Sequence, residues 1–183
     1  MATFTFFHEF KKYLGDGTID LDTHTFKWML SNTAPTADTD TVKANITEIS
    51  AAFGYSAGGT ALASVTWSET GAGTGIWRFT AADTTFTASG GSFGALRYAV
   101  LYDDTPSSPA DPLVGYLDHG SSITITDGNS LTIDVGFSRI PANLAASASM
   151  IFSSLALSNR TCLRSHSTTT SPFAPKTCSQ SPS

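Results

Sequence analysis

Residues 92–137 read SFGALRYAVLYDDTPSSPADPLVGYLDHGSSITITDGNSLTIDVGF and carry the strongest strand pattern of the chain. Tyr98, Val100 and Tyr102 alternate with residues that are themselves mostly apolar, so a strand over 95–102 has two apolar faces. Such a strand usually lies in the centre of a sheet or between two layers. The stretch therefore predicts a buried central strand, and it contains no pattern of catalytic residues.

Turn chemistry divides the remainder of this stretch. Pro106, Pro109 and Pro112 fix φ and withhold three backbone donors, so residues 103–112 are predicted to form a rigid loop. Further strands are predicted over 113–118, 122–126 and 131–136. Residues 127–130, Asp-Gly-Asn-Ser, predict a hairpin between the last two strands, because Gly and Asn tolerate positive φ.

Upstream of this stretch the period changes. The helical spacing of Phe6, Phe7, Phe10 and Leu14 predicts a short amphipathic helix over 4–14. A strand follows over 25–31, with alternation that places three side chains on its core face: Phe26, Trp28 and Leu30.

Residues 32–60 are rich in turn formers and are predicted to form a long ordered loop with one helical turn. Ile46, Ile49 and Phe53 are its expected anchors. Loops of this length inside compact domains are usually functional or docked. A hairpin with a long tip is then predicted from strands over 61–67 and 76–80.

These elements predict an all-β fold, an antiparallel β-sandwich of about seven strands with a short N-terminal helix and an extended C-terminal arm. The 183 residues divide into a β-sandwich domain over 1–140 and a low-complexity extension over 141–183. The extension is rich in Ser, Thr and Pro, as in segments that do not fold alone. It holds Cys162 and Cys178, whose pairing the sequence leaves open.

The charge of the chain is low and unevenly distributed. Charged residues make up 14% of the sequence, against about 25% in typical domains. Residues 1–140 carry all fifteen acidic and seven of the ten basic residues, a net charge of −8, whereas residues 141–183 carry three basic residues and no acid. The acidic body argues against nucleic-acid binding, and the basic extension favours self-association or an acidic partner.

No stretch of the sequence predicts membrane association. Nowhere do about eighteen apolar residues follow one another, as a spanning helix requires, and MATFTFFHEFKK lacks the pattern of a signal peptide. We therefore expect a protein that is made and used in the cytosol of the producing cell.

The sequence contains no recognisable pattern of catalytic or metal-binding residues. Four scattered histidines lack the spacing of a zinc motif or a triad: His8, His24, His119 and His166. Two aspartate groups could offer oxygens to a hard cation but do not match a calcium loop, and turn capping is their expected role: Asp16, Asp20 and Asp22, and Asp103 with Asp104. The Gly-Gly pairs complete no phosphate loop and are interpreted as turns or bulges. We therefore expect no catalytic, cofactor-binding or metal-binding residue, and no enzyme.

Six aromatic residues could in principle form a sugar platform: Trp28, Trp67, Trp77, Tyr98, Tyr102 and Tyr116. Five of the six occupy alternating strand positions, which favours core packing. Carbohydrate binding stays open as the minor alternative.

Four segments of the sequence together resemble a widespread group of small virion proteins of tailed bacteriophages. They are the Leu-Ser-Asn-Thr-Ala-Pro strand exit at 30–35, Thr-Glu-Ile at 47–49, Gly-Tyr-Ser-Ala-Gly-Gly at 54–59 and the block 86–135. The resemblance implies a component of the phage particle and brings no catalytic residue or cofactor with it. Residues 141–183 do not match the usual ending of this group.

We therefore expect a capsid decoration, or cement, protein on the outer surface of the virion. It would oligomerise and bridge neighbouring major capsid subunits, with the loops 32–60 and 103–112 and the extension 141–183 as contact regions. The expected partners are the major capsid protein and further copies of the chain, a trimer being one arrangement, with no nucleic acid and no membrane. The alternatives are a tail or head-tail connector component and a receptor-binding or glycan-binding tail tip.

Overall fold

The computed structural model describes residues 3–134 and 155–158, the latter by their backbone. The elements in chain order are β1 Thr3–Phe6, α1 His8–Gly15, β2 Phe26–Ser31, the 3-10 turn η1 Lys43–Asn45, β3 Thr60–Ala61, β4 Thr66–Glu69, β5 Trp77–Thr80, β6 Thr84–Thr87, β7 Phe93–Asp103, β8 Leu113–Ile125, β9 Ser130–Ile133 and β10 Leu155–Ser158. The predicted all-β class with a short helix near the N-terminus is confirmed.

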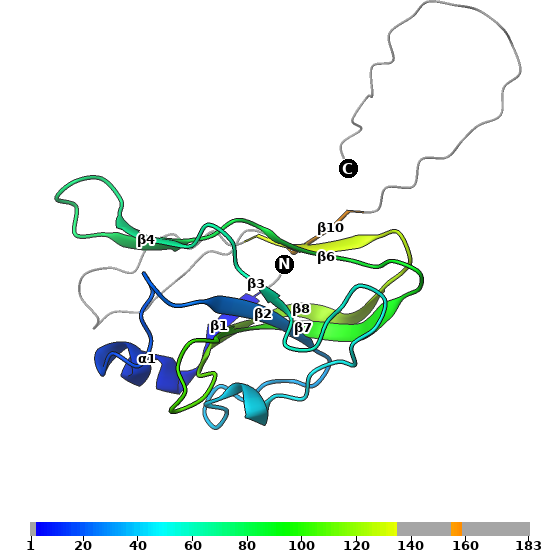
Figure 1. The fold of residues 1–183 in the computed structure, drawn as a ribbon, viewed down its shortest axis with the longest axis horizontal. Coiled ribbons are helices and arrows are strands. Elements are labelled where there is room, and N and C mark those ends of the chain that lie inside the picture. The colour runs from blue at the N-terminus through cyan, green and yellow to red at the C-terminus, as the bar shows by residue number, and fades with distance from the viewer. Residues whose placement is uncertain (1–2, 135–154, 159–183) are drawn as a thin grey trace, which may run out of the picture.

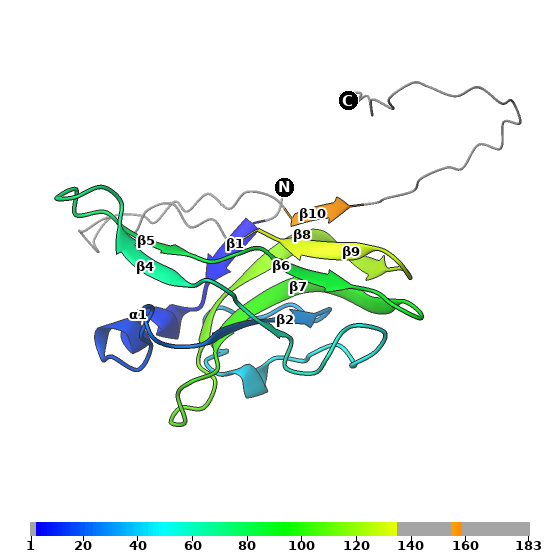
Figure 2. The same ribbon diagram turned by 45° about the horizontal axis from the view of Figure 1, so that its top comes forward.

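The strands form two layers, which lie one above the other in Figure 1, whereas Figure 2 looks more directly onto the layer that contains β4, β5, β6 and β9. One layer is a five-stranded sheet in the order β1-β8-β7-β2-β3. The other contains the three-stranded sheet β10-β9-β6 and, beside it, the two-stranded sheet β4-β5 (Figure 1). All of these pairings are antiparallel, as predicted for a β-sandwich.

The main core lies between the layers and takes alternate side chains from several of their strands. From β2 these are Phe26, Trp28 and Leu30, which are completely buried, as predicted. Phe86 of β6 and Leu131 of β9 meet them from the other layer. Burying one such side chain stabilises the fold by roughly 1.5–3 kcal/mol, so these alternating positions hold the layers together.

A second cluster lies on the opposite face of the five-stranded sheet. Val100 and Tyr102 of β7 pack there with Phe7, Met29 and Leu113, and the loop 32–60 contributes Ile46. The two apolar faces predicted for the central strand are therefore confirmed. Among the described residues no third layer of strands lies over this second face of the sheet, and the loop 32–60 packs against it through Ile46.

The predicted helix over 4–14 is too long at its N-terminal end. Residues Thr3–Phe6 form β1, which pairs with β8 so that Phe4 lies opposite Leu117 and Phe6 opposite Gly115. The helix begins only at His8 and ends at Gly15. Strand pairing at the sheet edge overrides the helical spacing of the phenylalanines, because tertiary contacts outweigh a weak local preference.

The predicted hairpin between 122–126 and 131–136 is wrong. β8 pairs with β1 and β7, whereas β9 pairs with β6 and β10 in the other layer. The turn itself exists, but its Gly128 N–H donates to the Ala88 carbonyl, and the Ala88 N–H donates to the Asn129 carbonyl. These contacts direct the chain across the sandwich to β6.

Two predicted strands are joined and one is divided. The segments 113–118 and 122–126 belong to the single strand β8, which bulges where residues 119–122 lie opposite one residue of β7. The segment 61–67 breaks into β3 and β4, because Ser64 has a φ of 53°, outside the range of a β-strand. β6 escaped prediction because its sequence TTFT contains only one strongly apolar residue.

The division of the chain at residue 140 stays a prediction, since residues 135–154 and 159–183 lie outside the described part. Within the described residues the extension contributes β10, which pairs with β9 so that Leu155 lies opposite Ile133. In the same part of the chain no helix has the length and hydropathy needed to cross a membrane.

Candidate functional site

The two loops predicted as contact regions meet in the structure. Val42 and Pro112 form an antiparallel bridge. On either side of it, the Lys43 N–H donates to the Asp111 carbonyl at 2.9 Å and the Leu113 N–H donates to the Thr41 carbonyl at 3.0 Å. The loops 32–60 and 103–112 therefore form one continuous, ordered surface, which lies below the five-stranded sheet in Figure 1.

Side chains strengthen this contact between the loops. The Lys43 ammonium lies 3.8 Å from the Asp111 carboxylate and 4.9 Å from the centre of the Tyr102 ring. The Tyr102 hydroxyl donates to the Gly58 carbonyl at 2.7 Å, and burial raises its pKa. One buried tyrosine on β7 thus connects the end of the long loop to the sheet.

Glu48 organises the second half of the loop 32–60. Its carboxylate accepts hydrogen bonds from the Tyr55 hydroxyl at 2.5 Å and from the Gly58 N–H at 2.7 Å. The Tyr55 hydroxyl accepts one in turn from the Leu30 N–H, and burial raises the pKa of this tyrosine. Through the single oxygen Oε1, the Glu48 carboxylate joins Tyr55 to the backbone at Gly58 and holds this part of the loop.

Two glycines allow the loop to approach the sandwich. A Cβ on Gly59 would lie 1.8 Å from the Trp28 carbonyl oxygen, and one on Gly54 would lie 2.0 Å from the Thr87 carbonyl oxygen. Both glycines also have positive φ. The prediction that this Gly-rich segment forms turns is confirmed. Glycine is required at these two positions because backbone packs directly on backbone there.

A tight turn at residues 52–55 exposes Phe53. Ala52 and Tyr55 exchange both backbone hydrogen bonds, and the two residues between them have positive φ, 46° for Phe53 and 104° for Gly54. Two-residue turns of this kind favour Asn-Gly, and placing another L-residue in the left-handed region costs about 1–2 kcal/mol. Phe53 is nevertheless 51% exposed. It was predicted to anchor the loop, but Tyr55 does so instead.

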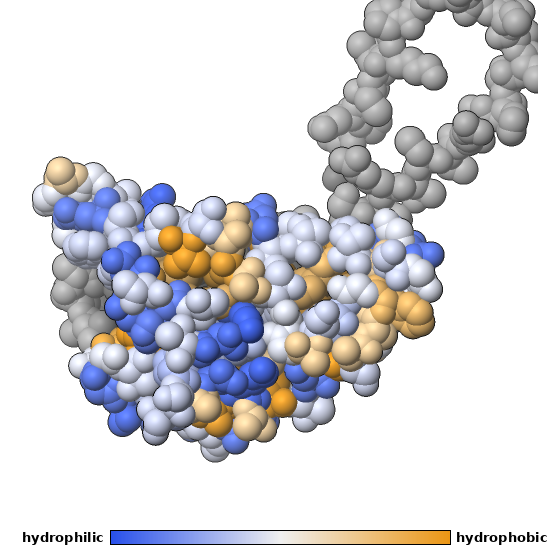
Figure 3. Space-filling model, viewed as in Figure 1, coloured by the Kyte–Doolittle hydropathy of each residue, from blue (hydrophilic) through white to orange (hydrophobic). Residues whose placement is uncertain are grey.

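Three turns gather around Phe53 at one end of the sandwich. The Phe53 carbonyl accepts the Ser89 N–H, and its ring covers Gly91, where an added Cβ would lie 2.6 Å from ring carbons. The Gly90 N–H donates to the Asp127 carboxylate at 2.8 Å. We call the residues 52–55, 89–91 and 127–129 the turn cluster. Figure 3 shows apolar residues at this end of the molecule.

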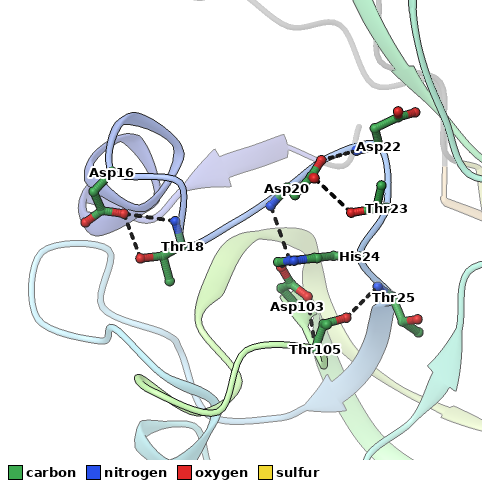
Figure 4. Close-up of polar contacts among 9 residues, drawn as sticks. All are labelled: Asp16, Thr18, Asp20, Asp22, Thr23, His24, Thr25, Asp103 and Thr105. Atoms are coloured by element: carbon green, nitrogen blue, oxygen red, sulfur yellow. Dashed lines mark hydrogen bonds and ion pairs between the residues drawn. The ribbon is translucent and has the colours of Figure 1, made fainter.

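The aspartate-rich segment before β2 also forms an ordered cluster, shown in Figure 4. The His24 Nδ1 lies 2.7 Å from Oδ2 of Asp103, whose side chain is completely buried. The Asp103 Oδ1 accepts the Thr105 N–H at 3.0 Å, and the Thr25 N–H donates to the Thr105 hydroxyl at 2.8 Å. This cluster joins the start of β2 to the end of β7 and the loop that follows.

Burial raises the pKa of the Asp103 carboxyl, although its hydrogen bonds with His24 and Thr105 act in the opposite direction. The His24 Nδ1 also accepts the Asp20 N–H at 3.2 Å. The imidazole nitrogen Nδ1 therefore contacts both the Asp20 N–H and the buried carboxyl, and the His24 side chain is only 21% exposed. The contact between His24 and Asp103 thus ties the segment before β2 to the start of the loop 103–112.

Asp16 and Asp20 of this segment cap turns, as predicted. Asp16 accepts the Thr18 N–H and hydroxyl, and these hydrogen bonds lower its pKa. Asp20 accepts the Asp22 N–H, which lowers its pKa too. Among the described residues no group of three or more His, Cys, Asp or Glu side chains is placed to hold a metal ion.

The remaining polar candidates lie apart from one another. Asp104 pairs with Lys27 at 2.6 Å, and His8 lies 3.0 Å from Asp38 on the surface. His119 contacts the Ser121 carbonyl in the bulge of β8. His166, Cys162 and Cys178 lie outside the described residues.

The six aromatic candidates do not form one platform. Trp28, Tyr98 and Tyr102 are buried, and Tyr116 packs beneath the sheet against Phe7. Trp67 and Trp77 stack on the β4-β5 hairpin, with ring centres 5.6 Å apart, and Trp77 is 43% exposed. Core packing is therefore confirmed for most of the set, and Trp77 is the exception.

Sequence reasoning did not find the residues that hold this surface together. In the sequence, Glu48 and Tyr55 stand out only within the segments that carry the resemblance, and no local pattern predicts the burial of Asp103. The available signal was the Gly-Tyr-Ser-Ala-Gly-Gly segment, whose glycines indicate close backbone packing beside an aromatic anchor. Pairing across 79 residues, as between His24 and Asp103, leaves no local pattern.

No family model, curated protein or solved structure matches this chain, so the resemblance to phage virion proteins stays a prediction.

Proposed function

We propose that this chain is a structural protein of a phage particle that binds the outer surface of the capsid as a decoration protein. It would bridge major capsid subunits through the surface formed by the loops 32–60 and 103–112. The proposal assigns no catalytic step and no cofactor to the chain. Its location is the virion, after assembly in the cytoplasm of the host.

One observation carries this proposal: the two long loops are ordered against each other and against the sheet. The bridge between Val42 and Pro112 and the contacts of Lys43 and Glu48 fix their backbone through groups of the chain itself. A preformed surface loses little conformational entropy on binding, which favours lasting protein contacts. The resemblance at 30–35, 47–49, 54–59 and 86–135 supports the same role.

Cementing has a simple thermodynamic basis. A protein that binds only the assembled shell stabilises the shell, because binding is linked to assembly. An interface of about 1,600 Å² is enough for stable attachment. The low charge of the chain, 14% of its residues, limits the desolvation cost of such an interface.

Copy number tests the proposal. We expect a stained gel of purified particles to show this protein in amounts comparable with the major capsid protein. Particles that lack it should burst at a lower temperature than particles that carry it. Absence from purified particles, or an unchanged bursting temperature, would contradict the cementing role.

A receptor-binding or glycan-binding tail tip is the second candidate function, and the exposed indole of Trp77 favours it. Indole faces stack on sugar rings, and the Trp77 indole is held in place by stacking on the Trp67 indole. A tip or a connector requires far fewer copies per particle than a decoration protein. A low copy number together with binding to a glycan array would support the tip.

A further inference from the structure

Phe53 occupies a position that suits it poorly in the isolated protein. The backbone of its turn has positive φ at both central residues, and more than half of its side chain is exposed. An asparagine would satisfy both the turn and the solvent better. Strain of this kind is found at functional sites more often than elsewhere, so the outlier itself indicates a role outside folding.

The contacts around Phe53 show that its side chain does not pack the core. Its ring lies on Gly91 and does not enter the main core, which Tyr55 reaches from the same turn. The backbone contacts that hold the turn cluster come from Ala52, Ser89 and Ala88, and none of them requires an aromatic side chain at position 53. The ring is therefore displayed at the surface.

The size and charge of the turn cluster define the partner. The cluster contains ten residues, against the 20–30 residues per side of a standard interface. It is too small to hold a stable dimer by itself and suits a single anchoring contact within a larger interface. Asp127 is its only charged residue, and the carboxylate is already bonded to the Gly90 N–H. The binding site on the partner that would complement the turn cluster is therefore concave and largely uncharged.

We propose that Phe53 is the anchor residue of the capsid contact and inserts into an apolar socket on the major capsid protein. This inference rests on the proposed function, places the anchor within the loop 32–60, and extends the contact surface to the neighbouring turns at 89–91 and 127–129. Aromatic anchors that fill a pocket commonly dominate the free energy of an interface. The small size of the turn cluster argues against a second copy of the chain as the binding partner.

The first experiment uses the isolated full chain and asks whether Phe53 is needed for folding. We compare the melting temperatures of the wild type and Phe53→Asn. The inference requires the variant to melt within about 4 °C of the wild type or above it, because relief of strain offsets the lost ring contact. A larger fall would show that Phe53 packs the fold, and it would overturn the inference.

The second experiment measures binding of the purified chain to phage heads that lack it. We expect Phe53→Asn to bind at least about tenfold more weakly than the wild type, as for other anchor residues. Trp77→Thr, which removes the other exposed aromatic, should bind within about twofold. Equal binding by Phe53→Asn would overturn the inference and leave the decoration function standing.

The two failures are distinguishable. If the wild type itself does not bind the heads, the proposed function fails, and the inference fails with it. If Trp77→Thr loses binding and Phe53→Asn does not, the anchor lies on the β4-β5 hairpin instead. Self-association of the wild type that Phe53→Asn abolishes, without any effect on head binding, would identify a second copy as the partner and contradict the proposal.

Discussion

Asp103 shows how one buried side chain makes stability depend on pH. Its folded pKa is raised by burial, so the folded state binds its proton more tightly than the unfolded state does. The resulting stability is complete below the ordinary pKa of an aspartate and is lost as the pH rises through the raised value. The dependence has the opposite sign from that of a carboxyl in an ordinary ion pair.

We therefore predict that the stability advantage of the wild type over Asp103→Asn shrinks as the pH rises from about 4 to about 8. Urea unfolding across this range would measure it. The control is Asp16→Asn, which removes a carboxyl whose pKa is lowered. There the advantage of the wild type should stay nearly constant above about pH 4 and fall only as the pH drops below the ordinary pKa of an aspartate. A pH-independent difference for Asp103→Asn would contradict the assignment.

A close approach of two backbones makes Gly59 the least replaceable glycine of the loop 32–60. An added Cβ would lie 1.8 Å from the Trp28 carbonyl oxygen, and φ is 73°. We predict that Gly59→Ala lowers the free energy of unfolding by about 3 kcal/mol. Gly17→Ala is the matched control, because Gly17 has a similar φ and no atom within 4 Å of the added Cβ. It should cost about 1 kcal/mol.

Equal losses in these two variants, measured by urea unfolding, would show that only the positive φ matters at Gly59. The sequence indicates that both positions are turns, but it does not distinguish them. The difference comes from the Trp28 carbonyl, which reaches Gly59 only after β2 and β3 have paired. Residue-scale features of this kind depend on contacts that the local sequence does not encode.

At the scale of elements, Phe79 is the most deeply buried anchor of the β4-β5 hairpin, and Trp67 packs beside it against the core. Phe79 is buried against Phe26, with ring centres 5.2 Å apart, whereas its strand neighbour Trp77 is largely exposed. A two-stranded sheet is marginal in water without such packing. The hairpin therefore takes its stability from the core and not from its own strand pairing.

We predict that Phe79→Ala lowers the free energy of unfolding by about 3–5 kcal/mol and Trp77→Ala by about 1 kcal/mol, chiefly through lost stacking on Trp67. Amide hydrogen exchange should quicken across β4 and β5 in the Phe79 variant. Unchanged exchange in that variant would show that the hairpin is held by other contacts.

Elements with strong alternation were predictable, and their partners were not. β2 and β7 lie where the sequence places them, because their apolar period is unambiguous. The turn at 127–129 was also correct, yet β9 leaves β8 and joins β6 in the other layer. Turn residues specify a change of direction, whereas the destination depends on which sheet edge is free. The loop contacts of Glu48 and Tyr55 escaped prediction for the same reason.

For the whole molecule, the division of the chain near residue 140 can be tested directly. The core clusters among the described residues lie entirely within 3–134. We predict that a chain ending at residue 140 unfolds cooperatively in urea. Its melting temperature should be lower than that of the full chain, since β9 loses its neighbour β10. A non-cooperative transition would show that the extension is part of the folding unit.

The pairing of β6 with β9 has a consequence during synthesis. Thr87 and its partner Ser130 are 43 residues apart, so β6 leaves the ribosome well before the strand that completes it. Three of its four residues are threonines, and Thr85 and Thr87 face solvent. Before β9 is synthesised, the hydroxyl-bearing side chains of β6 make it a poor template for aggregation. A strand rich in isoleucine at the same place would promote aggregation. The weak hydrophobicity that hid β6 from sequence inspection thus protects the nascent polypeptide.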